Sequence, residues 1–180
     1  EFKEMVRGLH RNGIRVIMDG GYNHTFVGDG SNFSLTVPGY FYRHKPDGSY
    51  SDASGCGNET ASERAMVRRY IVESVKYWAE EYHVDGFRFD LMGIHDVETM
   101  NEVKAELTKL DPSIFVYGEG WTASDSPLPE DQRAIKVNAP KLNDVAGFSD
   151  DLRDALKGSV FETTQAGFAS GKPEGNEESI

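Results

Sequence analysis

Short apolar runs alternate with longer amphipathic segments along most of this chain. The runs cover residues 14–19, 84–90 and 114–119, and strict alternation from Gly86 to Asp90 is the pattern of a β-strand. Between the runs, apolar residues recur at helical steps of three and four: Phe2, Met5, Val6 and Leu9, then Val67, Ile71, Val75, Trp78 and Tyr82, and finally Val97, Met100, Val103, Leu107 and Leu110. This order predicts an α/β fold with a parallel sheet, covered on both faces.

Polar residues predict where two of the helices begin. Thr60 and Glu63 have the spacing of a capping box, in which each residue satisfies a backbone N–H of the first helical turn. Asp96 stands directly before the next helical pattern and is predicted to be its N-cap. Both helices are expected to pack on the sheet, with Trp78 in the core.

The rest of the chain is less regular. Residues 25–59 are rich in glycine, serine, asparagine and aromatic side chains, which predicts a long loop over the C-terminal edge of the sheet. Residues 141–147 have the pattern of a short strand, residues 150–157 that of a weak helix, and residues 167–180 that of a loop or disordered tail. Nothing in the composition marks a domain boundary, so residues 1–180 are predicted to belong to one domain.

Each predicted strand ends in a carboxylate: Asp19, Asp90 and Glu119. Because parallel strands present their carboxyl ends at one edge, we expect the three acids at the edge that carries the active site in (β/α) barrels. Asp90 and Glu119 would then face each other, as the paired carboxylates of a glycosidase do. Arg88 shares a strand face with Asp90, and this pair serves either structure or chemistry.

Length and composition narrow the interpretation further. The chain has 180 residues, whereas an eight-stranded barrel typically needs roughly 250. A net charge of -11 argues against a nucleic-acid or anionic-membrane partner, and no apolar run approaches the roughly 20 residues of a membrane span. Glu1 falls inside a helical pattern, so a preceding segment is expected and the compartment, cytoplasmic or exported, is left open. The single cysteine, Cys56, is expected to be structural.

Three motifs taken together resemble a known enzyme family. Residues 19–24 (Asp-Gly-Gly-Tyr-Asn-His), 86–90 (Gly-Phe-Arg-Phe-Asp) and 118–121 (Gly-Glu-Gly-Trp) are similar in order and spacing to the first three sequence regions of the α-amylase family, glycoside hydrolase family 13. Residues 40–63 and 117–122 resemble in more detail the type I pullulanases, the bacterial debranching enzymes of that family. The resemblance implies a partial (β/α)8 TIM barrel, roughly strands three to six of the catalytic barrel.

The resemblance also implies the chemistry of the paired carboxylates. In the retaining mechanism of the family, Asp90 would be the nucleophile and Glu119 the general acid and then base, with carboxyl groups roughly 5–5.5 Å apart. Arg88 would keep Asp90 ionised through its opposite charge. Glu119 must hold a proton in order to donate it, so the two acids need opposite environments.

Other residues of the first motif would support this pair. The resemblance implies that His24 contacts the sugar at the cleaved bond, that Asp19 supports Arg88, and that Asn23 braces the loop or, in some relatives, a calcium ion. No cofactor is expected to be required, no metal ligand is assigned, and calcium is left open. Gly20-Gly21 replaces the bulky residues usual in the family, and two glycines at a strand end are expected to loosen the backbone and displace Tyr22, Asn23 and His24.

The remaining candidates come from the other motifs and from the long loop. Trp121 is a candidate apolar wall beside Glu119, and His95 is a candidate substrate contact. Two further residues are assigned to substrate binding or support, namely Tyr22 and Leu91. The aromatic side chains of the loop either stack on sugar rings or pack the loop itself: Phe33, Tyr40, Phe41 and Tyr42.

The activity that the resemblance implies belongs to a longer parent enzyme. That enzyme would hydrolyse α-1,6 branch linkages in pullulan, starch or glycogen. The family carries a late His-Asp region that is absent here and that His95-Asp96 cannot replace, so this chain alone is expected to be inactive and to need the remaining barrel segments. Three alternatives stay open: an α-1,4-acting amylase or neopullulanase-type enzyme, a non-catalytic glucan-binding piece, and a fragment that self-associates through uncovered strand edges and apolar faces.

Overall fold

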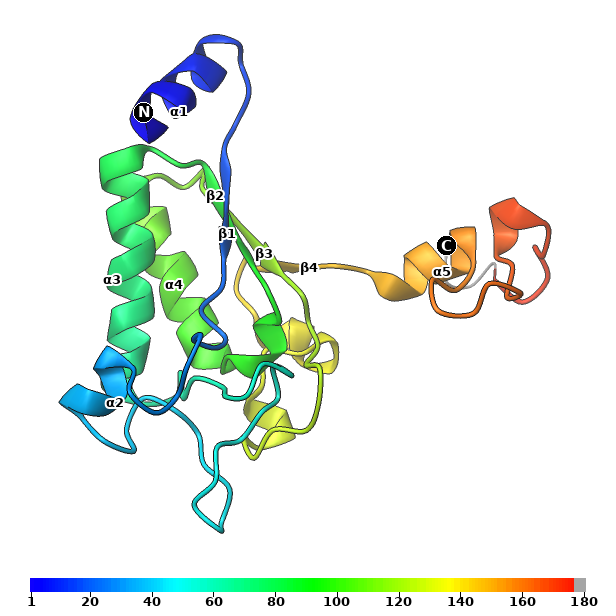
Figure 1. Cartoon of the computed structure of the whole chain (residues 1–180). Coiled ribbons are helices and arrows are strands. Elements are labelled where there is room, and N and C mark those ends of the chain that lie inside the picture. The colour runs from blue at the N-terminus through cyan, green and yellow to red at the C-terminus, as the bar shows by residue number, and fades with distance from the viewer. Residues whose placement is uncertain (177–180) are drawn as a thin grey trace. The chain divides into compact units, whose positions relative to one another are not determined.

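A parallel sheet of four strands forms the centre of the first part of the molecule (Figure 1). The computed structural model describes residues 1–176, and all structural statements below concern those residues. The strands follow one another in the sheet in chain order: β1 (Ile17–Gly20), β2 (Gly86–Phe89), β3 (Phe115–Gly118) and β4 (Ala146–Gly147). This topology confirms the predicted α/β fold with a parallel sheet, and it reduces the last predicted strand to two residues.

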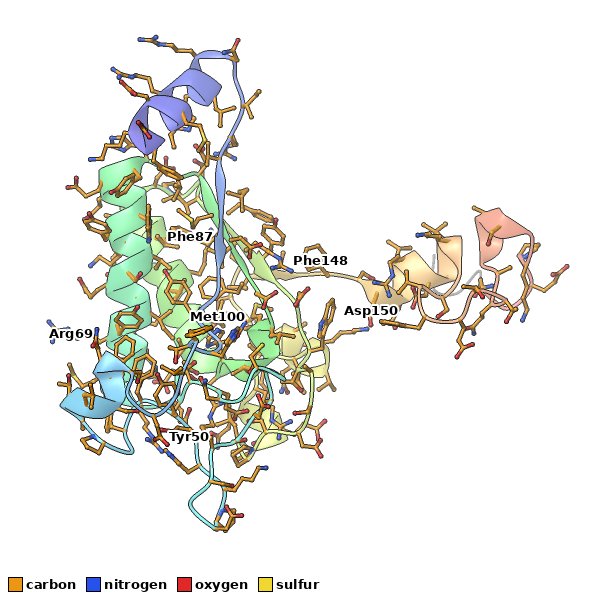
Figure 2. The ribbon with its side chains drawn as sticks, in the orientation of Figure 1. Tyr50, Arg69, Phe87, Met100, Phe148 and Asp150 are labelled. Carbon is orange, nitrogen blue, oxygen red and sulfur yellow. The ribbon has the colours of Figure 1, made fainter. Side chains whose placement is uncertain are left out.

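Two helices connect the strands and cover one face of the sheet: α3 (Ala65–Tyr82) between β1 and β2, and α4 (Val97–Leu110) between β2 and β3. A further helix, α1 (Phe2–Arg11), precedes β1 and contacts α3. Figure 1 shows α3 and α4 side by side on the same face. Phe87 of β2 and Met100 of α4 are fully buried in the core between these layers (Figure 2). Trp78 packs against this core, as predicted.

The opposite face of the sheet is largely open in the described chain. Phe87 and Phe89 point to the helices and are fully buried, whereas Ile17 and Phe115, on the other face, are 39% and 47% exposed. The prediction that both faces are covered is therefore wrong for the described residues. The apolar pattern of a strand shows that its side chains suit a core, but it does not show whether the covering layer belongs to the same 180 residues.

The two predicted helix starts have different outcomes. Asp96 caps α4, because its carboxylate accepts the backbone N–H of Thr99. The capping box at Thr60 and Glu63 is wrong: α3 begins at Ala65, and the Thr60 hydroxyl instead donates to a carbonyl of the preceding loop. Glu63 is drawn away by an ion pair with an arginine of that loop, which is a stronger interaction than a cap bond in water.

The long loop of residues 25–59 contains one short helix, α2 (Asn32–Thr36), and one isolated antiparallel bridge, between His44 and Tyr50, while a second joins Tyr42 to Thr60 just beyond it. The rings of Phe33 and Phe41 stack with centroids 3.8 Å apart, and Phe41 and Tyr42 are buried. These aromatic side chains therefore pack the loop itself, which was one of the two alternatives left open by the sequence.

A second compact unit begins at Phe148. It contains α5 (Asp150–Lys157), as predicted, and a short 3-10 helix, η4 (Phe168–Ser170), within the predicted tail. Residues 177–180 of that tail lie outside the described residues. The assignment of residues 1–180 to one domain stays a prediction.

Candidate active site

Arg88 joins the three predicted carboxylates at one edge of the sheet. Its Nη1 lies 2.8 Å from Asp19 Oδ1 and 3.0 Å from Asp90 Oδ1, and its Nη2 lies 2.7 Å from Glu119 Oε1. These contacts, first the hydrogen bond to Asp19, raise the pKa of the Arg88 guanidinium above its ordinary value. The guanidinium is therefore a permanent cation that holds a cluster of acids together.

The register of the parallel strands explains why these groups meet. Asp19 of β1 is paired with Arg88 of β2, and Asp90 and Glu119 directly follow β2 and β3. Because parallel strands end at the same edge, residues about 30 and 70 positions apart in sequence reach one another there. Asp19 is 67% exposed, Asp90 39% and Glu119 18%, so all three remain accessible to a molecule in solution.

Asp90 is held from a second side by the loop after β1. The buried Asn23 donates its Nδ2 to Asp90 Oδ2 at 2.9 Å and to the Asp90 carbonyl at 2.8 Å. The other end of the Asn23 amide contacts His24 Nδ1. A carboxylate that accepts hydrogen bonds from an arginine and an amide is fixed in orientation, which suits a group that must attack along a defined direction.

Glu119 shares the arginine with Asp90 but has a different second partner. Its Oε2 accepts the backbone N–H of Leu91 at 3.0 Å, while its Oε1 accepts from Arg88. The sequence predicted opposite environments for the two acids. In the structure both pair with Arg88, and they differ only in the second partner, which is Asn23 for Asp90 and the Leu91 N–H for Glu119. Trp121 is two residues beyond Glu119 and partly exposed, which is compatible with the predicted wall.

Two residues assigned to substrate binding or support pack on the helical side of the sheet. Tyr22 is largely covered and its hydroxyl is 2.8 Å from Ser74 Oγ on α3, so it packs between the sheet and a helix. Desolvation by burial raises the pKa of Tyr22. His95 is fully buried against Phe89. The His95 ring has no exposed surface among the described residues, whereas Tyr22 is partly exposed and its contacts suit a supporting role. The assignment of both residues to substrate binding or support stays a prediction.

Side-chain packing explains why a glycine is needed at the end of β1. A Cβ on Gly20 would lie 2.9 Å from the Tyr22 ring, whereas a Cβ on Gly21 would meet nothing within 4 Å. Gly20 therefore makes room for the tyrosine, while the expected displacement of the residues that follow stays a prediction. The close approach of the ring compensates for the lost side chain.

One group near the site was missed. Arg43 and Glu59 form an ion pair in the interior, with side chains 3% and 0% exposed. Arg43 Nη1 also donates to the carbonyl of Ile94, in the turn after β2, at 2.8 Å. Charged residues in a polar loop give no sequence signal of burial, so only the structure identifies them.

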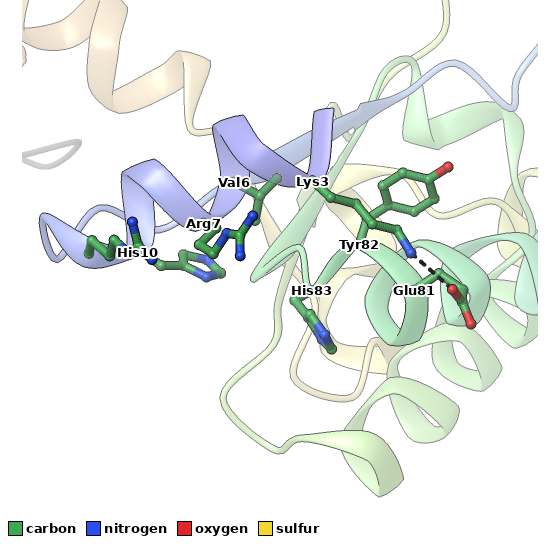
Figure 3. Close-up of a pocket in the computed structure, with 8 residues that line it drawn as sticks. Lys3, Val6, Arg7, His10, Glu81, Tyr82 and His83 are labelled. Carbon is green, nitrogen blue, oxygen red and sulfur yellow. Dashed lines mark hydrogen bonds and ion pairs between the residues drawn. The ribbon is translucent and has the colours of Figure 1, made fainter. Parts of the chain in front are cut away.

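A cavity of about 510 Å³ lies along α1, between that helix and the C-terminal end of α3 (Figure 3). Arg7, His10 and His83 contribute to its wall. His10 Nε2 already contacts Asp85 Oδ2 at 2.7 Å, and Lys3 forms an ion pair with Glu81, so both side chains have partners within the chain. Since the strands begin at this end, the cavity is separate from the edge that carries the acids.

Metal-binding clusters and membrane-spanning helices are both lacking in the described part of the chain. Among residues 1–176, no group of three or more histidine, cysteine or acidic side chains is placed to hold a metal ion. No helix in the same range is long and apolar enough to cross a bilayer. Whether calcium binds therefore stays an open prediction.

Comparison with known proteins agrees with the motifs. The pullulanase of Bacillus subtilis (strain 168) is 47% identical over 174 residues, which is 97% of this chain and 24% of the relative. Pullulanase 1, chloroplastic, of Arabidopsis thaliana is 37% identical over 95% of this chain and 19% of the relative. This chain thus spans about a quarter or less of the length of these relatives. No family model matches the sequence.

A solved structure gives the same result at the level of the fold. The pullulanase of Paenibacillus barengoltzii, crystallised with maltohexaose and α-cyclodextrin, superposes with a TM-score of 0.94 at 47% identity. The match covers 99% of this chain and 27% of that protein. The partial barrel expected from the motifs is consistent with this match.

Proposed function

Because this chain belongs to the pullulanases of the α-amylase family, we propose that it carries the two catalytic carboxylates of an enzyme that hydrolyses α-1,6 branch linkages in α-glucans such as pullulan, starch or glycogen. The observation that carries the proposal is the Arg88 cluster, in which Asp90 and Glu119 follow neighbouring parallel strands and share one guanidinium. Paired carboxylates are the machinery of retaining glycosidases.

In this proposal Asp90 attacks the anomeric carbon of the sugar while Glu119 gives its proton to the departing glycosidic oxygen. Water, deprotonated by Glu119, then hydrolyses the glycosyl ester on Asp90. Asn23 and Arg88 support the nucleophile, since both donate hydrogen bonds to its carboxylate. Glu119 Oε1 accepts from Arg88 Nη2 at 2.7 Å, so in this proposal the side chain leaves that contact before it gives a proton to the departing oxygen.

The test transfers the chain into a complete enzyme. The matching segment of the Bacillus subtilis pullulanase, 47% identical, is replaced by this chain, and reducing ends released from pullulan and from amylose are measured. We expect turnover of pullulan that falls by about a thousand-fold or more in Asp90→Asn and Glu119→Gln. Glu98→Gln, an exposed acid on α4, is the matched control and is expected to leave turnover unchanged.

The other outcomes separate the alternatives. Activity on amylose without activity on pullulan would keep the two carboxylates and replace the linkage assignment by an α-1,4-acting enzyme. Binding of maltotriose without turnover in the hybrid would favour a glucan-binding piece. For the chain by itself, we propose little or no turnover, and a rate on pullulan equal to that of the hybrid would refute this. A concentration-dependent mass in size-exclusion chromatography would support self-association.

A further inference from the structure

The buried ion pair of Arg43 and Glu59 contacts the turn that follows β2. Arg43 Nη1 is 3.2 Å from Glu59 Oε1 and 2.8 Å from the carbonyl oxygen of Ile94. Glu59 is held in turn by the Ala53 N–H at 2.6 Å and the Ser126 hydroxyl at 2.6 Å. A buried guanidinium is costly unless its donors are satisfied, so this arrangement fixes the position of Arg43 closely.

The turn from Leu91 to His95 reaches Glu119 by two hydrogen bonds. The Leu91 N–H donates to Glu119 Oε2 at 3.0 Å, and the Gly93 N–H donates to the Glu119 carbonyl at 3.0 Å. A Cβ on Gly93 would lie 2.5 Å from the carbonyl oxygen of Trp121, so the turn packs directly on the chain after β3. The conformation of this turn therefore sets both the main chain and the carboxylate of Glu119.

Leu91 has a backbone conformation that its side chain does not favour. Its φ of 43° and ψ of 50° lie in the left-handed region, which a branched residue adopts only where neighbouring contacts enforce it. At the far end of the same turn, the bond from Arg43 to the Ile94 carbonyl is such a contact. The Ile94 N–H also donates to the Leu91 carbonyl at 2.9 Å, which links the two ends.

We propose that Arg43 is a positioning residue for the general acid. Through the Ile94 carbonyl it holds the strained turn whose Leu91 N–H orients the Glu119 carboxylate. This inference rests on the proposed function of Glu119. The competing explanation is that Arg43 and Glu59 only tie the loop of residues 25–59 to the rest of the molecule, in which case their loss would reduce stability without a specific effect on turnover.

The test variant removes both fully buried charges. Glu63, the other partner of Arg43, loses its ion pair but is 31% exposed and can be solvated. Arg43→Met combined with Glu59→Gln keeps an oxygen for the Ala53 N–H but leaves the Ile94 carbonyl without its donor. The matched control is Lys104→Met. Lys104 is also a buried cation that donates to a backbone carbonyl, that of Ile114 at 2.8 Å, but it lies before β3 and away from the acids.

Steady-state kinetics on pullulan are measured in the hybrid enzyme described above. We expect the double variant to lose about 100-fold in kcat with KM changed less than about threefold, because misplacing a catalytic group affects the chemical step rather than binding. Lys104→Met is expected to lose stability but not kcat. Arg43→Lys, which retains a cationic donor, should recover part of the rate. A double variant that matches Lys104→Met in kcat would overturn the proposal.

A second measurement does not depend on activity. Amide hydrogen exchange in the 180-residue chain is expected to become about tenfold faster over residues 91–95 in the double variant and to stay unchanged there in Lys104→Met. Unchanged exchange would show that Arg43 does not hold the turn. A hybrid that is inactive with the unsubstituted segment would refute the proposed function instead, so the two failures are distinguishable.

Discussion

His95 is a fully buried histidine with neither ring nitrogen hydrogen-bonded among residues 1–176. Its ring stands edge-on to Phe89, with centroids 5.7 Å apart. Burial, together with the positive charge of Arg43, lowers the pKa of His95 to about 4, and the negative charge of Asp96 opposes this shift. The native state therefore holds a neutral imidazole, and a protonated one is incompatible with this environment.

The effect on stability follows from proton linkage. The unfolded chain binds a proton at His95 below about pH 6.5, while the folded chain does not do so until the pH approaches about 4. The unfolded state therefore gains protons first, and the free energy of unfolding falls as the pH decreases through this window. With these two pKa values the loss is about 1 kcal/mol between pH 7 and pH 5.5, rising to about 3 kcal/mol by pH 4.

The variant that tests this is His95→Leu, which has a similar volume and no titratable group. Urea unfolding is measured at pH 7 and pH 5.5, above the isoelectric point of about 4.9 where solubility is lowest. We expect the variant to gain about 1 kcal/mol relative to the natural chain over this interval. The buried neighbour Met92, replaced by leucine, is the control and should show a constant difference. A His95→Leu difference that does not change with pH would refute the reasoning.

Three further substitutions have direct structural consequences, each measured by chemical or thermal unfolding. Asp96→Ala removes the cap of α4, which accepts the Thr99 N–H at 3.0 Å, and leaves Arg68 without the partner that lies 3.0 Å away. We expect the free energy of unfolding to fall by about 3 kcal/mol, and a fall below about 1 kcal/mol would contradict this role. His83→Gly relieves the left-handed φ of 55° at the end of α3 and should raise Tm by about 2–4 °C. A lower Tm would show that contacts of the His83 ring stabilise the fold by more than the backbone strain costs. Gly86→Ala places a Cβ 2.5 Å from the Phe115 carbonyl oxygen, so we expect the free energy of unfolding to fall by about 2 kcal/mol or the chain to fail to fold. An unchanged stability would show that β2 and β3 do not approach so closely at this position.

The elements that follow from local pattern were predictable. Alternation from Gly86 to Asp90 identified β2 and the buried side of Phe87 and Phe89, and helical spacing identified α3 and α4. Placing a carboxylate at each strand end required only the chain order of strands and helices, because parallel strands share an edge. The position of Asp96 as an N-cap was equally local.

Contacts between distant segments were not predictable. The pairing of Arg88 with Glu119 depends on the relative height of β2 and β3, which a periodic pattern does not specify. His95 belongs to a polar motif, yet its burial depends on packing against distant segments, including the chain at Ala134, whose N–H donates to the His95 carbonyl. The burial of Arg43 was harder still to predict, since a charged loop residue is more often exposed.

The electrostatics of the cluster bear on the expected inactivity of the chain by itself. Arg88 contributes one positive charge to three carboxylates, and its shortest contact, 2.7 Å, is with Glu119, the proposed general acid. As long as this ion pair persists, Glu119 Oε1 is directed at the guanidinium and not at a leaving oxygen of the substrate. A sugar hydroxyl beside Arg88 would take the place of Glu119 and free its carboxylate from the ion pair. A polar group from further barrel strands would have the same effect. Under the proposed function, the shared guanidinium is therefore itself a physical reason to expect low turnover, because the proposed acid and the proposed nucleophile compete for the same cation.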